Sequence, residues 1–337
     1  MIRVLLVSDK PDDGIAFYRS TMPWNDIQKD HNVSVTVKHY SEYVGWNLIT
    51  AHDVLFISNP RAQKHLDIIK VAKSYGIKVW SDYDDCYLDI PEENESFHVL
   101  TAGHVVQNTK ECLMESDITT VSTAALKEYF LPYSTRIQVV PNAFPIELLS
   151  GSSLGELVIA QHNFVSWRGS KSHKKNVREY AKEISEIKEN NPEWIFNFFG
   201  LNPEFLETKY NHYDSIPLFD SFYRLKRFSS KIHIVTLYDR PFNKSKSNIA
   251  WIEATLAGSV VLAPDWEEWQ KPGIVNYSSK EDFKVKLQSL INGEYDLNQL
   301  FEKSREYLYN NLSLKKVNKD RLRILNELCV RKSDYSA

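Results

Sequence analysis

The sequence is poor in cysteine and in long hydrophobic runs, and each shortage excludes a class of protein. Three cysteines, Cys86, Cys112 and Cys329, stand far apart without a C-x-x-C pair, which argues against a disulfide framework and against a zinc site. The longest apolar runs, such as residues 259–263, are of strand length and fall far short of the ~18 residues that a membrane helix needs. No basic segment followed by an apolar stretch opens the chain, so we expect a cytosolic protein without a secretory signal.

The chain also lacks a large net charge, since 41 Lys and Arg face 44 Asp and Glu. This balance excludes a basic nucleic-acid coat and an acidic tail. The charge is uneven, however: residues 1–150 hold 13 basic and 20 acidic side chains, and residues 151–337 hold 28 and 24. A basic second half suits a domain that grips phosphates, and unevenly solvated surfaces explain the difference equally well.

The 337 residues, 42% of them hydrophobic, indicate an ordinary folded protein of two domains. Short β-branched runs alternate with helical patterns in the first half, which indicates a parallel sheet with crossover helices. The expected strands are 3–8, 33–39, 54–58, 78–81, 118–121 and 137–140. The expected helices between them are 63–75 and 123–130.

Prolines, glycines and serines gather in residues 141–155, which predicts a loop between two domains. We expect a Rossmann-like domain over residues 1–148, a second over 149–313 and a helix over 314–337 that packs back on the first domain. The second series has expected strands at 156–161, 194–199, 232–236 and 259–263 and expected helices at 174–189, 247–257, 297–310 and 314–330. Ligands of open α/β sheets bind at the carboxyl ends of the strands, so the active site should lie between the domains.

The strongest chemical signal lies in residues 239–264. A loop containing Asn243, Ser245, Lys246 and Ser247 opens a helix, so backbone N–H groups and a lysine converge where an anion would bind. Glu253 follows on that helix, before a buried strand. This segment resembles the donor-binding segment of group 1 (family 4) retaining glycosyltransferases of the GT-B fold.

The resemblance implies roles for these residues. A carboxylate at the Glu253 position holds the ribose of a nucleotide-sugar in that family, and the preceding loop touches the diphosphate and the sugar. The family pattern is E-x7-E, and its first position falls on Ser245 instead of a glutamate. This departure leaves the sugar contact at Ser245 open, and an ordinary capped helix is the plain alternative.

Residues 164–175 give a second match, expected just after the first strand of the second domain. Members of the family carry an arginine here and a lysine about five residues later, both neutralising the pyrophosphate. Arg168 matches the arginine, and either His173 or Lys174 matches the lysine. Fixed cations lower the barrier because the leaving diphosphate gains charge as the glycosidic bond breaks. A solvated basic helix start is the alternative interpretation.

In the first half, residues 12–23 follow the first expected strand with the pattern G-x-x-x-Y-R-x-x-x-P. The pattern resembles a loop of a subset of these transferases, in which a glycine, here Gly14, lets the backbone approach the donor phosphates. Arg19 then faces the cleft or pairs with a neighbouring aspartate.

Residues 80–91 end a strand with a carboxylate cluster that contains Asp82, Asp84 and Asp85. Such a D-x-D-D run alone suggests a divalent metal, because hard cations prefer carboxylate oxygens. The matches at Arg168 and Glu253 favour a metal-free site instead, in which the aspartates face the acceptor and order the loop. The run resembles the strand end of phage-encoded members of the family, and we add His104 downstream as a candidate on the acceptor side.

The resemblance therefore implies a retaining transfer of a sugar from a nucleotide-diphosphate sugar, a UDP-sugar first, to an acceptor hydroxyl, without cofactor or metal. A hydroxymethylated base in phage DNA is slightly favoured as acceptor, in the cytoplasm of the host, and a surface glycan or a small molecule is the alternative. Two other hypotheses are a non-catalytic module that binds a nucleotide or glycan and, ranked lower, a sugar-nucleotide epimerase. Tyr223 or Trp167 could stack on a DNA base. The cations that could follow DNA phosphates are Lys171, Lys174, Lys175, Arg224, Lys226, Arg227 and Lys231.

Overall fold

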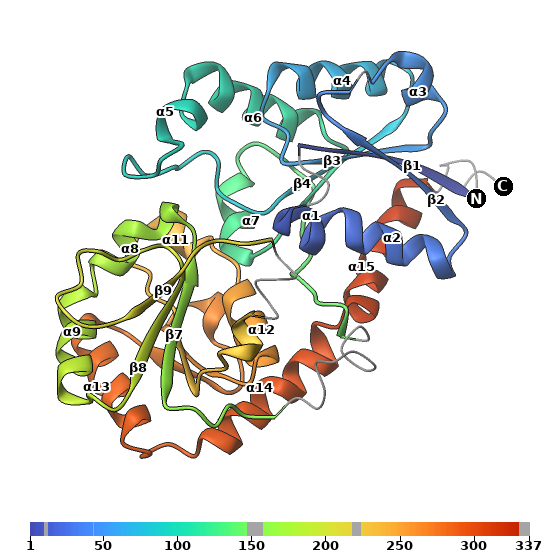
Figure 1. The fold of residues 1–337 in the computed structure, drawn as a ribbon. Coiled ribbons are helices and arrows are strands. Elements are labelled where there is room, and N and C mark those ends of the chain that lie inside the picture. Colours follow the sequence, from blue (N-terminus) through green and yellow to red (C-terminus); the bar gives the residue numbers. More distant parts are fainter. Residues whose placement is uncertain (10–12, 43, 147–157, 218–223, 330–337) are drawn as a thin grey trace.

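The chain forms two α/β domains with a shared interface (Figure 1). The structure is a computed structural model and describes residues 1–9, 13–42, 44–146, 158–217 and 224–329. The expected boundary at residues 148 and 149 lies outside these residues. Each domain contains a parallel sheet of six strands within the described residues, which confirms the expectation of two Rossmann-like domains.

The first sheet has the strand order β2-β1-β3-β4-β5-β6, with every neighbouring pair parallel. Chain order reverses beside β1, so the topological switch point of this sheet lies between β1 and β3. Val4, Leu6 and Val54 are fully buried in the core around this sheet. Strands that helices cover on both faces are apolar along almost their whole length. The strands are β1 (Ile2–Ser8), β2 (Val33–His39), β3 (Val54–Ser58), β4 (Lys78–Tyr83), β5 (Ile118–Val121) and β6 (Ile137–Val139).

The second sheet has the order β12-β11-β10-β7-β8-β9, again parallel throughout. Its switch point lies between β7 and β10. The order is that of a dinucleotide-binding sheet, in which ligands occupy the crevice beyond the carboxyl ends of the two strands at the switch point. The strands are β7 (Phe164–Gly169), β8 (Ile195–Gly200), β9 (Asn211–Tyr213), β10 (Ile232–Ile234), β11 (Val260–Pro264) and β12 (Ile274–Tyr277).

Helices cover both faces of each sheet (Figure 1). Those around the first sheet are α1 (Gly14–Arg19), α2 (Thr21–Asp30), α3 (Trp46–Thr50), α4 (Gln63–Ser74), α5 (Phe97–Leu100), α6 (Gly103–Glu115) and α7 (Ala124–Phe130). The second half contains α8 (Lys174–Arg178), α9 (Ala181–Asn190), α11 (Pro241–Lys244), α12 (Ile249–Leu256), α13 (Lys280–Ile291), α14 (Leu297–Asn311) and α15 (Leu314–Cys329).

One expected strand is wrong. Of residues 156–161, the described positions 158–161 form no strand, and the first strand of the second domain is β7, Phe164–Gly169. The apolar stretch before it is held instead by a hydrogen bond from Ala160 N to Gly258 O (2.8 Å). Val165 and Trp167 point into the core and give β7 the buried face that stabilises a strand. Arg168 therefore stands at the carboxyl end of a strand and not in a loop after one.

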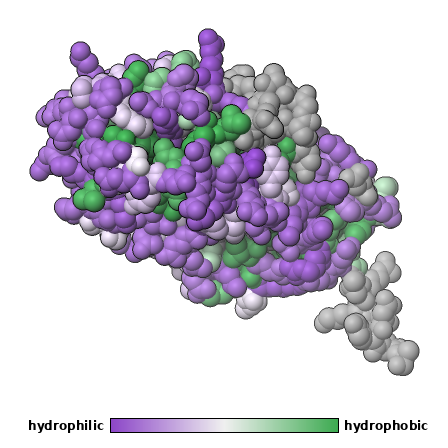
Figure 2. Space-filling model, turned by 90° about the horizontal axis from the view of Figure 1, so that it is seen from below, coloured by the Kyte–Doolittle hydropathy of each residue, from purple (hydrophilic) through white to green (hydrophobic). Residues whose placement is uncertain are grey.

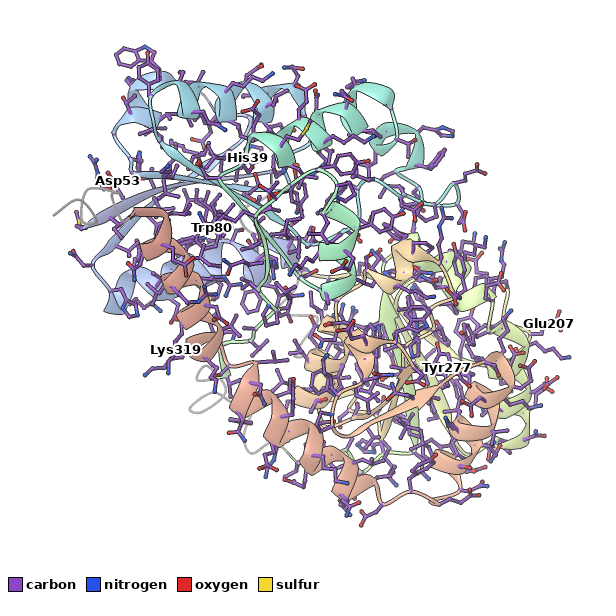
Figure 3. The ribbon with its side chains drawn as sticks, turned by 180° about the vertical axis from the view of Figure 1, so that it is seen from behind. His39, Asp53, Trp80, Glu207, Tyr277 and Lys319 are labelled. Atoms are coloured by element: carbon purple, nitrogen blue, oxygen red, sulfur yellow. The ribbon has the colours of Figure 1, made fainter. Side chains whose placement is uncertain are left out.

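The last helix, α15, leaves the second domain and packs against α2 of the first, as the red helix in Figure 1 shows. Asn318 Nδ2 donates to Pro23 O (3.2 Å) and to Asp26 Oδ2 (2.8 Å). Figure 3 shows the same helix from behind, with Lys319 on it and with Trp80 and Tyr277 marking the two sheets. The chain thus crosses between the domains twice, which ties their relative position to packed side chains.

The surface seen from below is mostly hydrophilic, and its apolar patches are small and interrupted (Figure 2). Among the residues that the structure describes, every helix is too short or too polar to pass through a bilayer.

Candidate active site

A cavity of about 460 Å³ lies between the two domains. Its walls come from the carboxyl ends of both sheets and from the helices that follow them. On the second domain it opens beyond β7 and β10, which is the switch point of that sheet. Ten residues predicted from the sequence line it: Gly14, Arg19, Asp84, Asp85, Trp167, Arg168, His173, Lys246, Ser247 and Glu253.

Glu253 sits in the wall of this cavity and is only 2% exposed. It lies on α12, one turn after the helix begins, and its side chain contacts residues of both domains in the cavity wall. Arg168 Nε, at the end of β7, lies 2.8 Å from Glu253 Oε2. The hydroxyl of Tyr18, on α1 of the other domain, donates to Glu253 Oε1 at 2.8 Å. The carboxylate is therefore paired on both oxygens, as a buried charge requires.

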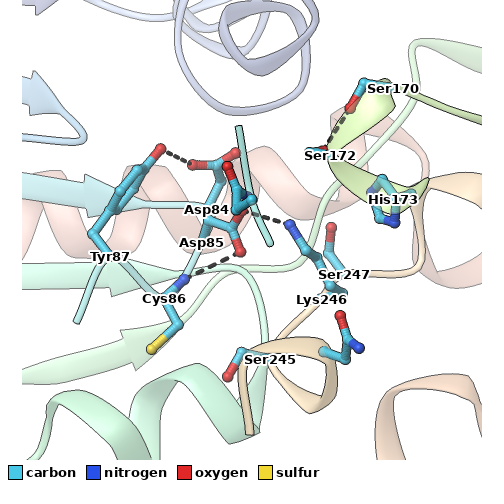
Figure 4. Close-up of polar contacts among 12 residues, drawn as sticks. Asp84, Asp85, Cys86, Tyr87, Ser170, Ser172, His173, Ser245, Lys246 and Ser247 are labelled. Atoms are coloured by element: carbon cyan, nitrogen blue, oxygen red, sulfur yellow. Dashed lines mark hydrogen bonds and ion pairs between the residues drawn. The ribbon is translucent and has the colours of Figure 1, made fainter. Parts of the chain in front are cut away.

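Three consecutive residues before α12 are each held by the first domain. Thr123 Oγ1 donates to the backbone oxygen of Ser245 (3.1 Å), and Asn142 Nδ2 donates to Ser247 Oγ (2.8 Å). Between them, Lys246 Nζ lies 2.6 Å from Asp85 Oδ2, an ion pair visible in Figure 4. The loop that should face a phosphate group is thus fixed from the opposite side of the cleft, with its lysine in the cavity wall.

The uneven charge of the two halves appears at this interface as ion pairs. Besides Lys246 and Asp85, Lys175 Nζ lies 2.7 Å from Glu93 Oε1 and Arg240 Nη2 lies 3.6 Å from Asp89 Oδ1. In each pair the acid comes from the first half and the base from the second. Part of the charge difference therefore serves domain contact rather than ligand binding.

Asp84 lies beside Asp85 at the carboxyl end of β4 and faces the cavity. Its backbone is fixed from two neighbouring strands, because its N–H donates to Asn59 Oδ1 (3.2 Å) and its carbonyl accepts from Ser122 Oγ (3.1 Å). The hydroxyl of Tyr87 donates to Asp84 Oδ1 at 3.3 Å (Figure 4). Burial, with the adjacent charge of Asp85, raises the pKa of Asp84 to about 6.

His173 lines the cavity, whereas its neighbour Lys174 is exposed and does not. Burial, together with the charges of Lys246 and Arg168, lowers the pKa of His173 to about 3, so the imidazole is neutral at pH 7. Asn176 Nδ2 donates to His173 Nδ1 (3.0 Å), which leaves the ring proton on Nε2. His173 can therefore act as a hydrogen-bond donor to an anion, but not as a cation.

Asn243 does not line the cavity but supports a residue that does. Its side chain is buried, and its Nδ2 donates to Asn176 Oδ1 (2.8 Å) and to Tyr238 O (2.8 Å). Because Asn176 in turn holds His173, Asn243 fixes the orientation of that ring. The predicted loop contact to the donor thus becomes a supporting contact.

Arg19 and Asp82 form a buried ion pair, the alternative that the sequence left open for Arg19. Arg19 Nη2 lies 2.6 Å from Asp82 Oδ1, and the two side chains are 1% and 4% exposed. Arg19 Nη1 also donates to Val140 O and, at 3.3 Å, to Asn142 Oδ1. One edge of Arg19 reaches the cavity wall, but its charge is fully engaged in joining α1 to the sheet.

Five of the predicted catalytic, donor-binding and acceptor-side residues lie outside the wall of the cavity: Lys174, Asn243, Ser245, Asp82 and His104. The hydroxyl of Ser245 turns back to Pro241 O (3.1 Å), so the position of the missing family glutamate does not face the cavity here. His104 is exposed on α6. Tyr18 is the main residue that sequence reasoning missed, because the pattern over residues 12–23 contained it without an assigned role. Its partner Glu253 lies 235 positions away in the sequence.

A smaller pocket of about 150 Å³ adjoins the cavity at the switch point of the first sheet, between the ends of β1 and β3. Asp13 and Ile15 line both spaces. The smaller pocket adds Asp9 and Arg61, whose Oδ2 and Nη2 lie 2.6 Å apart. It also adds Asn59, which is the one non-glycine residue with positive φ (47°) among the described residues. Asparagine adopts this conformation more readily than most other residues, and here its Oδ1 accepts the hydrogen bond from Asp84 N.

Within the described residues, no three His, Cys, Asp or Glu side chains are arranged to hold a metal ion together. Cys86 and Cys112 are buried free thiols, and burial raises the pKa of each to about 12. They therefore contribute no nucleophile to the cavity at neutral pH.

Neither protein-family models nor curated proteins match the sequence. Solved structures do match in fold. An alpha-glucosyltransferase in complex with UDP has a TM-score of 0.65 at 12% identity, with 97% of this chain and 100% of that chain covered. An alpha-glucosyltransferase in complex with UDP and a 13-mer DNA containing a central A:G mismatch has a TM-score of 0.66 at 11% identity, over 96% and 99% of the two chains.

Two further similar structures come from bacteria. The UDP-forming alpha,alpha-trehalose-phosphate synthase of Burkholderia vietnamiensis has a TM-score of 0.64 at 12% identity, with coverage of 96% and 100%. A protein described as a UDP-N-acetylglucosamine 2-epimerase from Listeria monocytogenes has a TM-score of 0.55 at 11% identity, with coverage of 97% and 96%. The likeness over the whole chain shows that this protein has the GT-B fold.

Proposed function

We propose that the protein is a glycosyltransferase that binds a nucleotide-diphosphate sugar, a UDP-sugar first, in the cavity between its domains. The observation that supports this most is the meeting of Glu253, Arg168 and Lys246 at the switch point of the second sheet. A buried carboxylate suits ribose hydroxyls, and two cations suit a pyrophosphate. The structural neighbours in complex with UDP support the same choice of donor.

In this proposal the donor's nucleotide lies on the second domain and its sugar faces the first. Glu253 accepts hydrogen bonds from the ribose, while Arg168 and Lys246 face the pyrophosphate and His173 donates through Nε2. The backbone at Gly14 leaves room for the phosphates, because a Cβ added there would meet no atom within 4 Å. No metal is assigned.

The proposed reaction retains the anomeric configuration. The acceptor oxygen bonds to the anomeric carbon on the face that the diphosphate leaves, a donor phosphate oxygen takes the acceptor's proton, and the bond to the nucleoside diphosphate breaks with its electron pair on the leaving oxygen. Arg168 and Lys246 stabilise the charge that develops on the diphosphate. In this proposal the domains close over the bound donor and exclude water from it.

The donor assignment predicts that UDP stabilises the protein. At 100 times its Kd, UDP should add ~2.7 kcal/mol to the free energy of unfolding and raise the melting temperature by several degrees. A thermal-shift series over nucleoside diphosphates measures this and identifies the base. If UDP and every other nucleoside diphosphate left the melting temperature unchanged, the donor site would be refuted. Stabilisation without transfer to any acceptor would instead identify a non-catalytic binding module.

For the acceptor we propose a hydroxymethylated base in DNA, with the small pocket beside Asp84 as the place for the reacting group. The DNA complex of one structural neighbour favours this class of acceptor. Arg61 and Asp9 offer the pocket a cation and a carboxylate, and Arg61 Cζ lies 4.9 Å from the centre of the Tyr87 ring. A polar ring drawn out of a duplex could bind there.

The structure changes the list of cations that could follow a DNA strand. Lys231 precedes β10, so it lies at the sheet edge opposite the cavity, where it donates to Asn163 Oδ1 (2.8 Å). Lys175 is paired with Glu93. Trp167, proposed for stacking, is buried with its indole N–H on Thr236 Oγ1 (3.1 Å), and Tyr223 lies outside the described residues.

A DNA acceptor predicts salt-sensitive binding and base-dependent turnover. If three phosphates are contacted, affinity for a duplex with a hydroxymethylated base should fall about 40-fold between 50 and 200 mM salt. Nucleoside diphosphate should be released with this duplex and not with an unmodified one of the same sequence. Release with a glycan or small molecule, and never with the modified duplex, would decide for the alternative acceptor. Epimerisation of the donor with no acceptor present would identify an epimerase.

A further inference from the structure

Tyr18 and Glu253 join the two domains at the centre of the cleft. Tyr18 is 2% exposed on α1, and Glu253 is 2% exposed on α12. Their hydrogen bond of 2.8 Å lies in the wall of the cavity, which both residues line. Burial raises the pKa of Tyr18 well above its ordinary value, and the charge of Glu253 raises it further, so the hydroxyl keeps its proton at every physiological pH.

The same carboxylate is the group that the proposed function assigns to the donor's ribose. Its two oxygens already have partners, Tyr18 on Oε1 and Arg168 on Oε2. A buried carboxylate without partners is strongly disfavoured, so these contacts stabilise the protein whenever no other donor group reaches Glu253. A ribose hydroxyl that bonds to Oε1 from the cavity would approach the position that the tyrosine hydroxyl holds.

We propose, resting on the proposed function, that Tyr18 competes with the donor's ribose for Glu253 and so sets the affinity for the nucleotide. Donor binding is then an exchange of partners. Glu253 passes from Tyr18 to a ribose hydroxyl, and Arg168 passes from Glu253 to the pyrophosphate. Only a nucleotide with ribose hydroxyls can complete the exchange, because a ligand without them cannot replace the hydrogen bond that Tyr18 gives up.

The consequence reaches the first domain, because Tyr18 belongs to α1 and its neighbour Arg19 anchors that helix to the first sheet. When Tyr18 gives up Glu253, one contact across the cleft is lost at the moment the donor arrives. The pairs of Lys246 with Asp85 and of Asn142 with Ser247 stay in place. Tyr18 is therefore a positioning residue that links the donor site to the acceptor-side domain.

Tyr18→Phe removes the competing hydroxyl and keeps the ring packed against Phe17, whose centroid lies 5.1 Å away. We expect the Kd for UDP to fall about tenfold, since a hydrogen bond to a charged group must no longer be broken. The Kd for 2′,3′-dideoxy-UDP should stay the same in both proteins. Tyr83→Phe is the matched control, because it removes another buried hydroxyl, which donates to Pro60 O at 2.7 Å and not to Glu253, and Tyr83 does not line the cavity. Its Kd for UDP should equal that of the wild type.

Each outcome of the titration decides something. If UDP binds wild type and Tyr18→Phe equally, or binds the variant more weakly, Tyr18 does not compete and the inference is wrong while the donor site stands. An equal gain with 2′,3′-dideoxy-UDP would also overturn it, because the ribose would then play no part. If UDP binds neither protein, the proposed function fails instead.

Discussion

Arg168→Ala should slow sugar transfer about 100- to 1000-fold, the largest effect on turnover that we expect from one side chain in the cavity. Arg168 lies at the end of β7, at the switch point of the second sheet, and faces the space that we assign to the pyrophosphate. Negative charge grows on the leaving diphosphate as the glycosidic bond breaks, so a fixed cation there stabilises the transition state more than the bound donor. The loss should therefore appear mainly in kcat.

The measurement is the steady-state release of nucleoside diphosphate in the presence of acceptor. Arg178→Ala is the matched control, since it removes the same charge from an exposed position on α8, where Arg178 packs 5.0 Å from the centre of the Phe205 ring. That variant should keep its turnover within twofold. Turnover of Arg168→Ala within a few-fold of the wild type would contradict the assignment of the donor site.

Asp82→Ala should lower the free energy of unfolding by about 3–5 kcal/mol, the largest effect on stability that we expect. Asp82 is 3% exposed, holds Arg19 through two hydrogen bonds of 2.6 and 3.1 Å, and accepts a third from Thr120 Oγ1 at 2.5 Å. Without it, the buried guanidinium of Arg19 keeps its charge but loses its carboxylate. The loss of Asp82 also disfavours the charged form of Arg321 on α15. Burial and the charge of Arg19 already lower the pKa of Arg321 to about 9, and the charge of Asp82 opposes that decrease.

Urea denaturation of the variant, with the slope compared to that of the wild type, measures this loss. Asp53→Ala is the control, because it breaks an ion pair of similar geometry with Arg3 (2.8 Å) whose side chains are 48% and 36% exposed. Water screens that pair, so its loss should cost less than about 1 kcal/mol. Equal losses in the two variants would mean that burial of the Arg19 pair contributes nothing to stability.

The strands of the first sheet were predicted largely correctly from the sequence, whereas β9, β12, α6 and α13 were not predicted and the expected helix 174–189 is divided into α8 and α9. Strands such as Val54–Ser58 and Ile118–Val121 match their expected ranges, because an apolar β-branched run can hardly form anything else inside a parallel sheet. The error at residues 156–161 has the same physical origin. That run is apolar too, and only the packing of Trp167 and Val165 in the core decides that the following segment becomes β7.

For the candidate site, too, some features were predicted from the sequence and others depended on tertiary contacts. The family resemblance, together with the predicted alternation of strands and helices, placed Arg168, Lys246 and Glu253 at one site between the domains, and all three line the cavity. The sequence did not determine that Asp82 would form a buried ion pair with Arg19, nor that the Ser245 side chain would turn away from the cavity. Both facts depend on which side chains meet across the fold.

Only the tertiary structure decided how the two halves meet. Tyr18 reaches Glu253 across 235 positions and Lys246 reaches Asp85 across 161, and no local pattern encodes either pair. Strand order is equally hidden, since alternating strands and helices fit several orders, yet the order fixes where each switch point and its pocket lie. Local sequence determines whether each segment forms a helix or a strand. The contacts between distant residues form only when the segments pack together, because buried charges then need partners of opposite charge.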